Sequence, residues 1–128
     1  TSLAALHAEQ EKKISENTQS LTAKKLIAQP NINVLSSWNS LKIPEIINYN
    51  KIFMIVTNIA GSQTLEFSPF NYDEITKVCT QISSVYWNGG YATMIISVNF
   101  NNGTISYVCN KSNDSLTAQI NRIYGQKL

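Results

Sequence analysis

His7 is the single histidine of the chain, and histidine is the side chain most used for proton transfer and metal binding near neutral pH. It lies in a polar N-terminal segment, far along the sequence from the two cysteines, Cys79 and Cys109. A Cys–His nucleophile needs both side chains within hydrogen-bond reach, and a zinc site needs three or four protein ligands. The sequence therefore predicts no catalytic residue and no metal site.

Two other motifs have ordinary structural interpretations. Asp73 and Glu74 are adjacent carboxylates at an expected helix start, where they interact favourably with the helix dipole. Gly89 and Gly90 lack the strand, glycine-rich loop and helix that cradle a phosphate. We therefore expect no enzyme and no bound cofactor.

Cys79 and Cys109 lie 30 positions apart (109 − 79) in a chain whose polarity is mostly uncharged. Charged residues make up 14% of the sequence, whereas it holds 15 Asn, 14 Ser and 10 Thr. An even cysteine count and such a surface suit an oxidising compartment, which favours a Cys79–Cys109 disulfide. The alternative is two separate buried thiols.

The charge and hydropathy patterns argue against a nucleic-acid-binding protein and against a membrane span within the sequence. The formal charge is +2, and the lysines near the N-terminus are interleaved with glutamates, so no basic stripe for nucleic acid is present. No stretch approaches the roughly 20 apolar residues of a membrane span, and no leader pattern opens the sequence. We expect an exported chain whose targeting segment lies outside the 128 residues.

Residues 1–29 contain no Gly or Pro before Pro30, which predicts one long helix. Its apolar positions form a thin stripe on one face, consisting of Leu3, Leu6, Ile14, Leu21 and Ile27. Residues 30–50 predict a loop with one helical turn, in which Trp38 plugs the core. The stripe is too thin for a helix to be buried by its own domain alone, so a further partner is expected.

The rest of the chain alternates strands and a second helix. Residues 51–59 and 64–67 predict a hairpin, and 92–100 and 104–109 predict another around Asn101-Asn102-Gly103. Residues 71–85 predict a helix that starts at Asn71 and carries Cys79 on its buried face. Residues 116–124 fit either a strand or a helix, and we favour a strand.

The expected architecture is α+β in a single domain, 1–128: a long N-terminal helix packed on an antiparallel sheet, with a C-terminal region bounded by a disulfide. It divides into a helix (1–29), a connecting loop (30–50) and the sheet with the disulfide region (51–128). This arrangement resembles a type IV pilin of the type IVb branch. The residues that carry the resemblance are the hairpin 52–67, the segment 71–82 with Cys79, and the segment 107–110 with Cys109.

The resemblance implies a subunit of a bacterial type IV pilus that acts by polymerisation and surface adhesion. It implies homologous pilin subunits as partners, about 25 apolar residues before Thr1 that anchor the subunit in the inner membrane, and an extracellular filament as the final location. The chain is short between its cysteines, so a major pilin, a minor pilin and a secretion-system pseudopilin all stay open.

A second hypothesis belongs to a different class of protein. Tyr86, Trp87 and Tyr91 flank the Asn88-Gly89-Gly90 turn and could form a stacking surface for a ligand. The chain would then be a monomeric periplasmic or secreted domain that binds a receptor or glycan.

Overall fold

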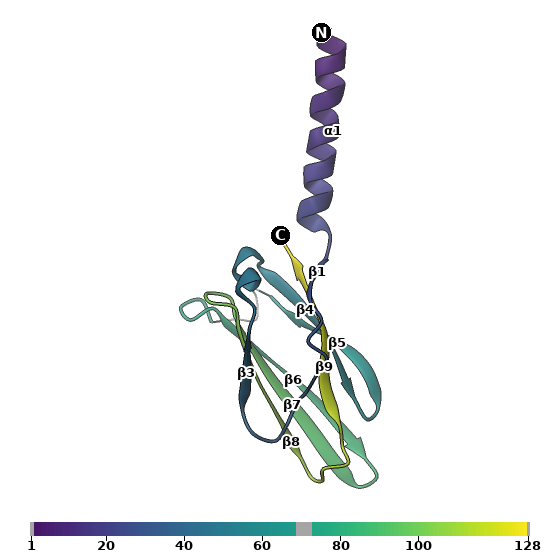
Figure 1. Ribbon diagram of the computed structural model, residues 1–128, viewed down its shortest axis with the longest axis vertical. Helices are drawn as coiled ribbons and strands as arrows, with labels where there is room; N and C mark the ends of the chain where they lie inside the picture. Colours follow the sequence, from purple (N-terminus) through teal and green to yellow (C-terminus); the bar gives the residue numbers. More distant parts are fainter. Residues whose placement is uncertain (1, 69–72, 128) are drawn as a thin grey trace.

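The computed structural model describes residues 2–68 and 73–127, without the side chains of residues 15–22. Its one α-helix, α1 (Leu3–Thr22), rises from one end of a β-sheet domain and points away from it (Figure 1). We call the described part of residues 25–127 the head. The predicted packing of a helix over residues 1–29 on the sheet is wrong, because the helix ends at Thr22 and lies on neither sheet.

The head consists of nine strands in two antiparallel sheets. One sheet has the order β1-β9-β4-β5, with β2 also paired to β9, and the other has the order β3-β8-β7-β6. The strands are β1 (Lys25–Ala28), β2 (Ile32–Asn33), β3 (Asn39–Lys42), β4 (Lys51–Asn58), β5 (Gly61–Phe67), β6 (Val78–Trp87), β7 (Gly90–Asn99), β8 (Thr104–Lys111) and β9 (Ala118–Gln126).

The two sheets cover each other and enclose one apolar core. β7 shows the reason in its sequence, since every second residue from Ala92 to Val98 is buried and the residues between them are more exposed. The core draws on both sheets, for example Met54 and Ile120 from one and Ile96 and Ile105 from the other. The second sheet therefore takes the place that we expected the N-terminal helix to fill, and the fold is a β-sandwich rather than α+β.

Tight turns connect several of the strands. Asn88 and Gly89 join β6 to β7 with φ of 50° and 76°, the type I′ geometry that matches the twist of a hairpin. The predicted hairpins at 51–67 and at 92–109 are both present, as β4–β5 and β7–β8. Strand β9 confirms the strand that we favoured over residues 116–124, although it begins and ends two residues later.

The predicted helix over 71–85 is wrong. Its residues from Val78 onward form β6, which pairs with β7 over ten residues without a register shift. The apolar residues have helical spacing, but the segment is also rich in β-branched residues, and pairing with β7 decides between the two periods. Before the strand, the Asp73 carboxylate accepts hydrogen bonds from the backbone N–H groups of Ile75 and Thr76 (2.8 and 3.0 Å), which makes a local turn. The predicted N-cap, Asn71, lies outside the described residues.

Residues 30–50 contain more structure than a loop. They hold β2, β3 and a short 3₁₀ helix, η1 (Pro44–Asn48), which matches the predicted helical turn. The predicted plug is wrong, because Trp38 is 60% exposed and the wholly buried side chains of this segment are those of Val34, which follows β2, and Ile46 in η1. Trp38 directly precedes the edge strand β3, where it lies at the rim of the sandwich, whereas η1 carries Ile46 into the core.

Candidate functional site

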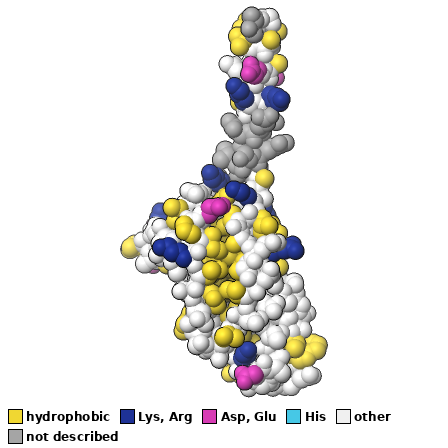
Figure 2. Space-filling model, viewed as in Figure 1, with side chains coloured by type: hydrophobic (Ala, Val, Ile, Leu, Met, Phe, Trp, Pro, Cys, Tyr) yellow, Lys and Arg dark blue, Asp and Glu magenta, His cyan; other side chains and the backbone are white. Residues whose placement is uncertain are grey.

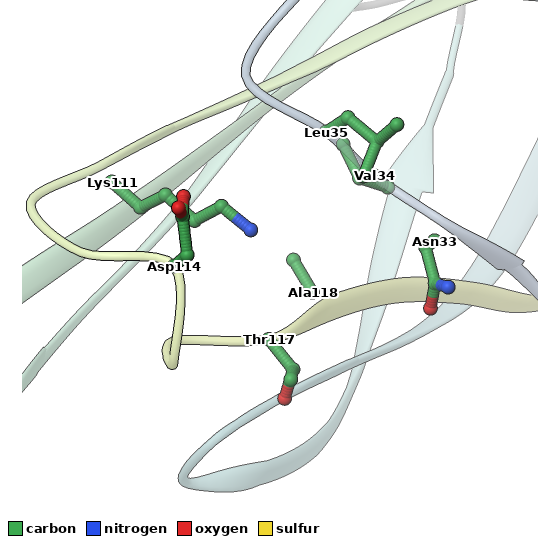
Figure 3. A pocket seen from close by; sticks show the side chains of 7 residues that line it. All are labelled: Asn33, Val34, Leu35, Lys111, Asp114, Thr117 and Ala118. Atoms are coloured by element: carbon green, nitrogen blue, oxygen red, sulfur yellow. The ribbon is translucent and has the colours of Figure 1, made fainter.

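The cavities found in the described part of the head have mixed polar and apolar linings. Figure 3 shows one of about 220 Å³ where the connection from β2 to β3 meets the connection from β8 to β9. Lys111 and Asp114 supply its charges and Thr117 its hydroxyl, and the remaining lining is Asn33, Val34, Leu35 and Ala118. No imidazole or thiol lies in this lining.

His7 and Asp73, two titratable residues singled out from the sequence, each interact with neighbouring groups of their own helix or turn. His7 lies on exposed α1 with Nε2 3.0 Å from Oε1 of Glu11, an i,i+4 pair on the helix surface. Hydrogen bonds from the N–H groups of Thr76 and Ile75 lower the pKa of Asp73, which keeps it ionised as a turn cap rather than poised to transfer protons. Among the described residues, no three His, Cys, Asp or Glu side chains are grouped to hold a metal ion.

The predicted disulfide is wrong, because Cys79 and Cys109 are both free and buried on the inner face of one sheet. Cys79 lies opposite Val98 of β7 and Cys109 opposite Met94, so they are two strands and four residues apart. That offset corresponds to about 10 Å across the strands and about 13 Å along them. A disulfide needs Cα atoms within roughly 7 Å.

Burial also lowers the reactivity of both thiols. Burial raises the pKa of the Cys79 thiol, with a smaller opposing effect from a hydrogen bond with the Ser68 backbone. Burial likewise raises the pKa of Cys109, and the nearby charge of Lys111 opposes it. Since the thiolate is the reactive form, neither cysteine is suited to nucleophilic or redox chemistry.

We expect reduction to leave the stability of the chain unchanged. A disulfide closing this loop would contribute about 3 to 4 kcal/mol, so dithiothreitol would lower the unfolding midpoint markedly if one existed. A thiol reagent should label neither cysteine in the folded chain and both in urea. The pH dependence follows from the raised pKa values of the two buried thiols, which hold their protons more tightly in the folded chain. The stability that this provides is complete below the unfolded thiol pKa of about 8.5 and is lost as the pH rises above it. Denatured protein without free thiols would contradict the assignment.

The five residues predicted to form an assembly stripe on the helix divide into three groups. Leu3 and Leu6 lie on α1 with exposed fractions of 82% and 46%, and Ile14 is also exposed. The side chain of Leu21 lies outside the described residues. Ile27 is not on the helix at all but in β1, where it packs against the core of the head. In the described part of the chain, no helix is long and apolar enough to cross a membrane.

The three aromatic residues singled out in the sequence lie together at the tip of the β6–β7 hairpin. Tyr86 and Tyr91 face each other across the two strands, and Trp87 is opposite Gly90 beside the turn. All three are exposed, Tyr86 to 83%. The tip lies at the end of the head away from α1 (Figure 1), and Figure 2 shows hydrophobic side chains gathered at that end.

Two further features escaped the sequence analysis. Figure 2 shows a strip of apolar side chains on the surface of the head, in the view where β3 and β1 face the reader. Partly buried residues that pack against the core belong to those strands, Ile27 and Ala28 of β1 and Leu41 of β3. The second feature is the free edge of β6, whose position follows from the strand order and not from the local sequence.

The geometry of the described residues is that of a β-sandwich head with an N-terminal helix that projects from it. Comparison with protein-family models, with curated proteins and with solved structures finds no match.

Proposed function

We propose that the chain is a non-enzymatic structural subunit of a filament of the type IV pilus kind, and that it polymerises through α1. The exposure of Leu3 and Leu6 on a helix outside the head carries the proposal. It rests on this projecting helix and on the β4–β5 hairpin, the part of the resemblance to pilins that is present in the described residues. It does not require the helix over 71–85, the disulfide or the packing of helix on sheet, which are corrected above.

A projecting helix of this kind gains stability by association. An isolated helix of 20 residues is marginal in water. The described side chains support this one through surface ion pairs, such as Lys13 with Glu9 at 3.8 Å, and through the Ser2 hydroxyl, which accepts a hydrogen bond from the Ala5 N–H at 3.1 Å. Apolar side chains at its exposed positions gain free energy when they are buried against neighbouring helices. Helices from several subunits, bundled side by side, would supply that burial.

The polar residues on the same face of α1 fit a role in assembly. His7 and Gln10 occur between the apolar positions of the stripe, at spacings of three and four residues. In helical bundles, single polar residues at such positions reduce stability but fix the register and number of helices. The stripe thus favours an assembly of defined register over non-specific aggregation.

The filament proposal is tested by a full-length variant that carries Leu3→Asp and Leu6→Asp. We expect it to be absent from sheared surface filaments in the cells that produce it, and its association into oligomers larger than a dimer, measured by sedimentation, to weaken more than tenfold. The unfolding midpoint of the head should not change, because α1 makes no substantial contact with the strands.

Lys12→Asp is the matched control. Lys12 is nine residues from Leu3, which at 3.6 residues per turn places it on the opposite side of α1. This variant introduces the same side chain without touching the stripe, and should assemble normally. Normal filaments from the Leu3/Leu6 variant, or equal loss from both variants, would contradict the proposal.

The exposed aromatic tip favours one second candidate, a monomeric domain that binds a receptor or glycan. Tyrosine and tryptophan rings supply contact area at low entropic cost and stack well on sugar faces. The same experiment separates the candidates. A binding domain would keep its function in the Leu3/Leu6 variant and lose it on Tyr86→Ser, whereas a filament subunit would show the reverse for assembly.

A further inference from the structure

Strand β6 forms one edge of its sheet and lacks the features that usually keep edge strands from pairing. Its ten residues, from Val78 to Trp87, include no charged residue and no proline. Its pairing with β7 is regular throughout, so no bulge twists it away. Natural proteins use charges, prolines, bulges or short length to block such edges.

The other edges of the sandwich are blocked in one of these ways. The edge formed by β1 and β2 is broken by Pro30 and by a register shift in β1. Strand β3 is four residues long and ends in Lys42. Strand β5 carries Glu66, whose Oε1 lies 2.5 Å from Nζ of Lys51. In the described part of the chain, β6 is therefore the exception.

The register shows which backbone groups of β6 are available. Trp87 and Gly90 flank a two-residue turn, which makes them a hydrogen-bonded pair, and such pairs alternate along an antiparallel ladder. The N–H and C=O groups of Thr80, Ile82, Ser84 and Tyr86 therefore point to the free edge. Within the described residues, the group from outside the sheet that bonds to this edge is the Asp73 N–H, at Val78 O.

The residues that present these groups form a pattern symmetric about Ile82. If a second β6 approaches antiparallel with the two-fold axis at Ile82, then Ile82 pairs with Ile82, Thr80 with Ser84 and Val78 with Tyr86. Each pair joins side chains of the same kind, and no like charges meet. Ile82 is 60% exposed and Tyr86 83% exposed, so both have apolar surface to bury.

The opposite face of β6 is already held by the head. Nε2 of Gln81 donates to the backbone oxygen of Glu66 at 2.8 Å, and Oγ of Ser83 donates to Oε1 of Gln63 at 2.8 Å. These bonds tie β6 to β5 across the sandwich and fix the strand in position. An incoming strand therefore meets a rigid template, which reduces the ordering cost of pairing.

We propose that two copies of the chain pair through their β6 edges, antiparallel and centred on Ile82, to make one continuous sheet of eight strands. This contact is independent of α1 and would link heads side by side, whatever the helices do. The contact is isologous, since the same surface serves both partners, and it therefore closes as a dimer.

Cross-linking tests the register. We would use the full chain carrying Leu3→Asp and Leu6→Asp, so that helix association does not contribute. Ile82→Cys should give a rapid intermolecular disulfide on mild oxidation, because residues facing each other at a hydrogen-bonded pair have Cα atoms about 5.5 Å apart. Ser84→Cys alone should not, because the two copies of residue 84 would be about 13 Å apart along the strands.

A charge at the centre of the edge tests the association itself. By sedimentation, the starting chain should show twice the 14.3 kDa monomer mass at high concentration, and Ile82→Lys should weaken the dimer at least tenfold. Asn110→Lys is the matched control, since Asn110 is exposed on the same face but on the inner strand β8, and it should leave the dimer intact.

Several results would overturn the proposal. A chain that stays monomeric at millimolar concentration would do so, as would equal cross-linking at positions 82 and 84 or equal weakening by both lysine variants. A monomeric chain whose Ile82 and Ser84 amides become protected from hydrogen exchange only on adding an extended peptide would show that another protein, and not a second copy, occupies the edge. Failure here leaves filament formation through α1 untouched, since that is read from the Leu3/Leu6 variant.

Discussion

Replacing Gly103 with alanine is expected to lower the free energy of unfolding by about 3 kcal/mol or more. Gly103 has φ of +77°, a region that L-residues enter at a cost, and an added Cβ would overlap the carbonyl oxygen of Ile43. The residue also bonds at both ends, because its oxygen accepts from Ile43 N and its N–H donates to Asn99 O, each at 2.9 Å. Relieving the clash would break the first of these bonds.

Gly89→Ala is the matched control for this prediction. Gly89 has nearly the same φ, +76°, but a Cβ built there meets no atom within 4 Å. Its substitution should therefore cost about 1 kcal/mol, from backbone strain alone. The two free energies come from urea denaturation of the full chain, with unchanged m-values as the check that both variants unfold alike. Equal losses would mean that the contact with Ile43 contributes nothing.

Replacing Ile46 with alanine is expected to cost about 2 to 5 kcal/mol, and replacing Trp38 with alanine less than about 1 kcal/mol. Ile46 is wholly buried in the core cluster, so its removal leaves a cavity between the sheets. Trp38 is the larger side chain, but most of its surface is already in water. Thermal and urea unfolding of the two variants measure the difference.

This pair of variants reverses the ranking that residue size alone would give. If Trp38→Ala proved the more damaging, η1 would not be the element that closes this end of the core. Ile46→Val provides an intermediate, since it removes one methylene and should cost about 0.5 to 1.5 kcal/mol. A graded series would confirm that buried volume, and not the 3₁₀ turn itself, accounts for the loss.

The hairpins could be predicted from the sequence because their information is local. Asn and Gly at positions 101–103 adopt turn conformations by their own chemistry, and the flanking β-branched residues favour strands. Strand β9 could also be predicted, although its apolar residues fit two periods. In each case the correct answer needed only the segment and its neighbours along the chain.

The errors concern contacts between distant segments. The spacing of Ile75, Val78, Ile82 and Val85 fits a helix, and only the partner strand β7 shows why a strand forms instead. The prediction of a disulfide is wrong for the same reason. Cys79 and Cys109 are separated by an intervening strand, which their spacing in the sequence does not reveal. The packing of the helix on the sheet is wrong because the second sheet, which covers the first, forms from segments far apart in the sequence.

The candidate surfaces show the same division. Tyr86, Trp87 and Tyr91 could be grouped in advance, since they flank one turn. The free edge of β6 could not, because which strand ends a sheet depends on the order of all its strands. A signal was nevertheless present, as the run from Val78 to Trp87 is uncharged over ten residues.

The projecting helix also sets the distance between its N-terminal end and the head. At 1.5 Å per residue, the 20 residues of α1 span about 30 Å, so whatever holds the chain near Leu3 lies that far from β1. Ions screen charges over about 8 Å at physiological salt, so this spacing is nearly four screening lengths. A charged surface at the far end of the helix is therefore screened from the head, whose electrostatic interactions depend on its own charged side chains, such as Lys51 and Glu66.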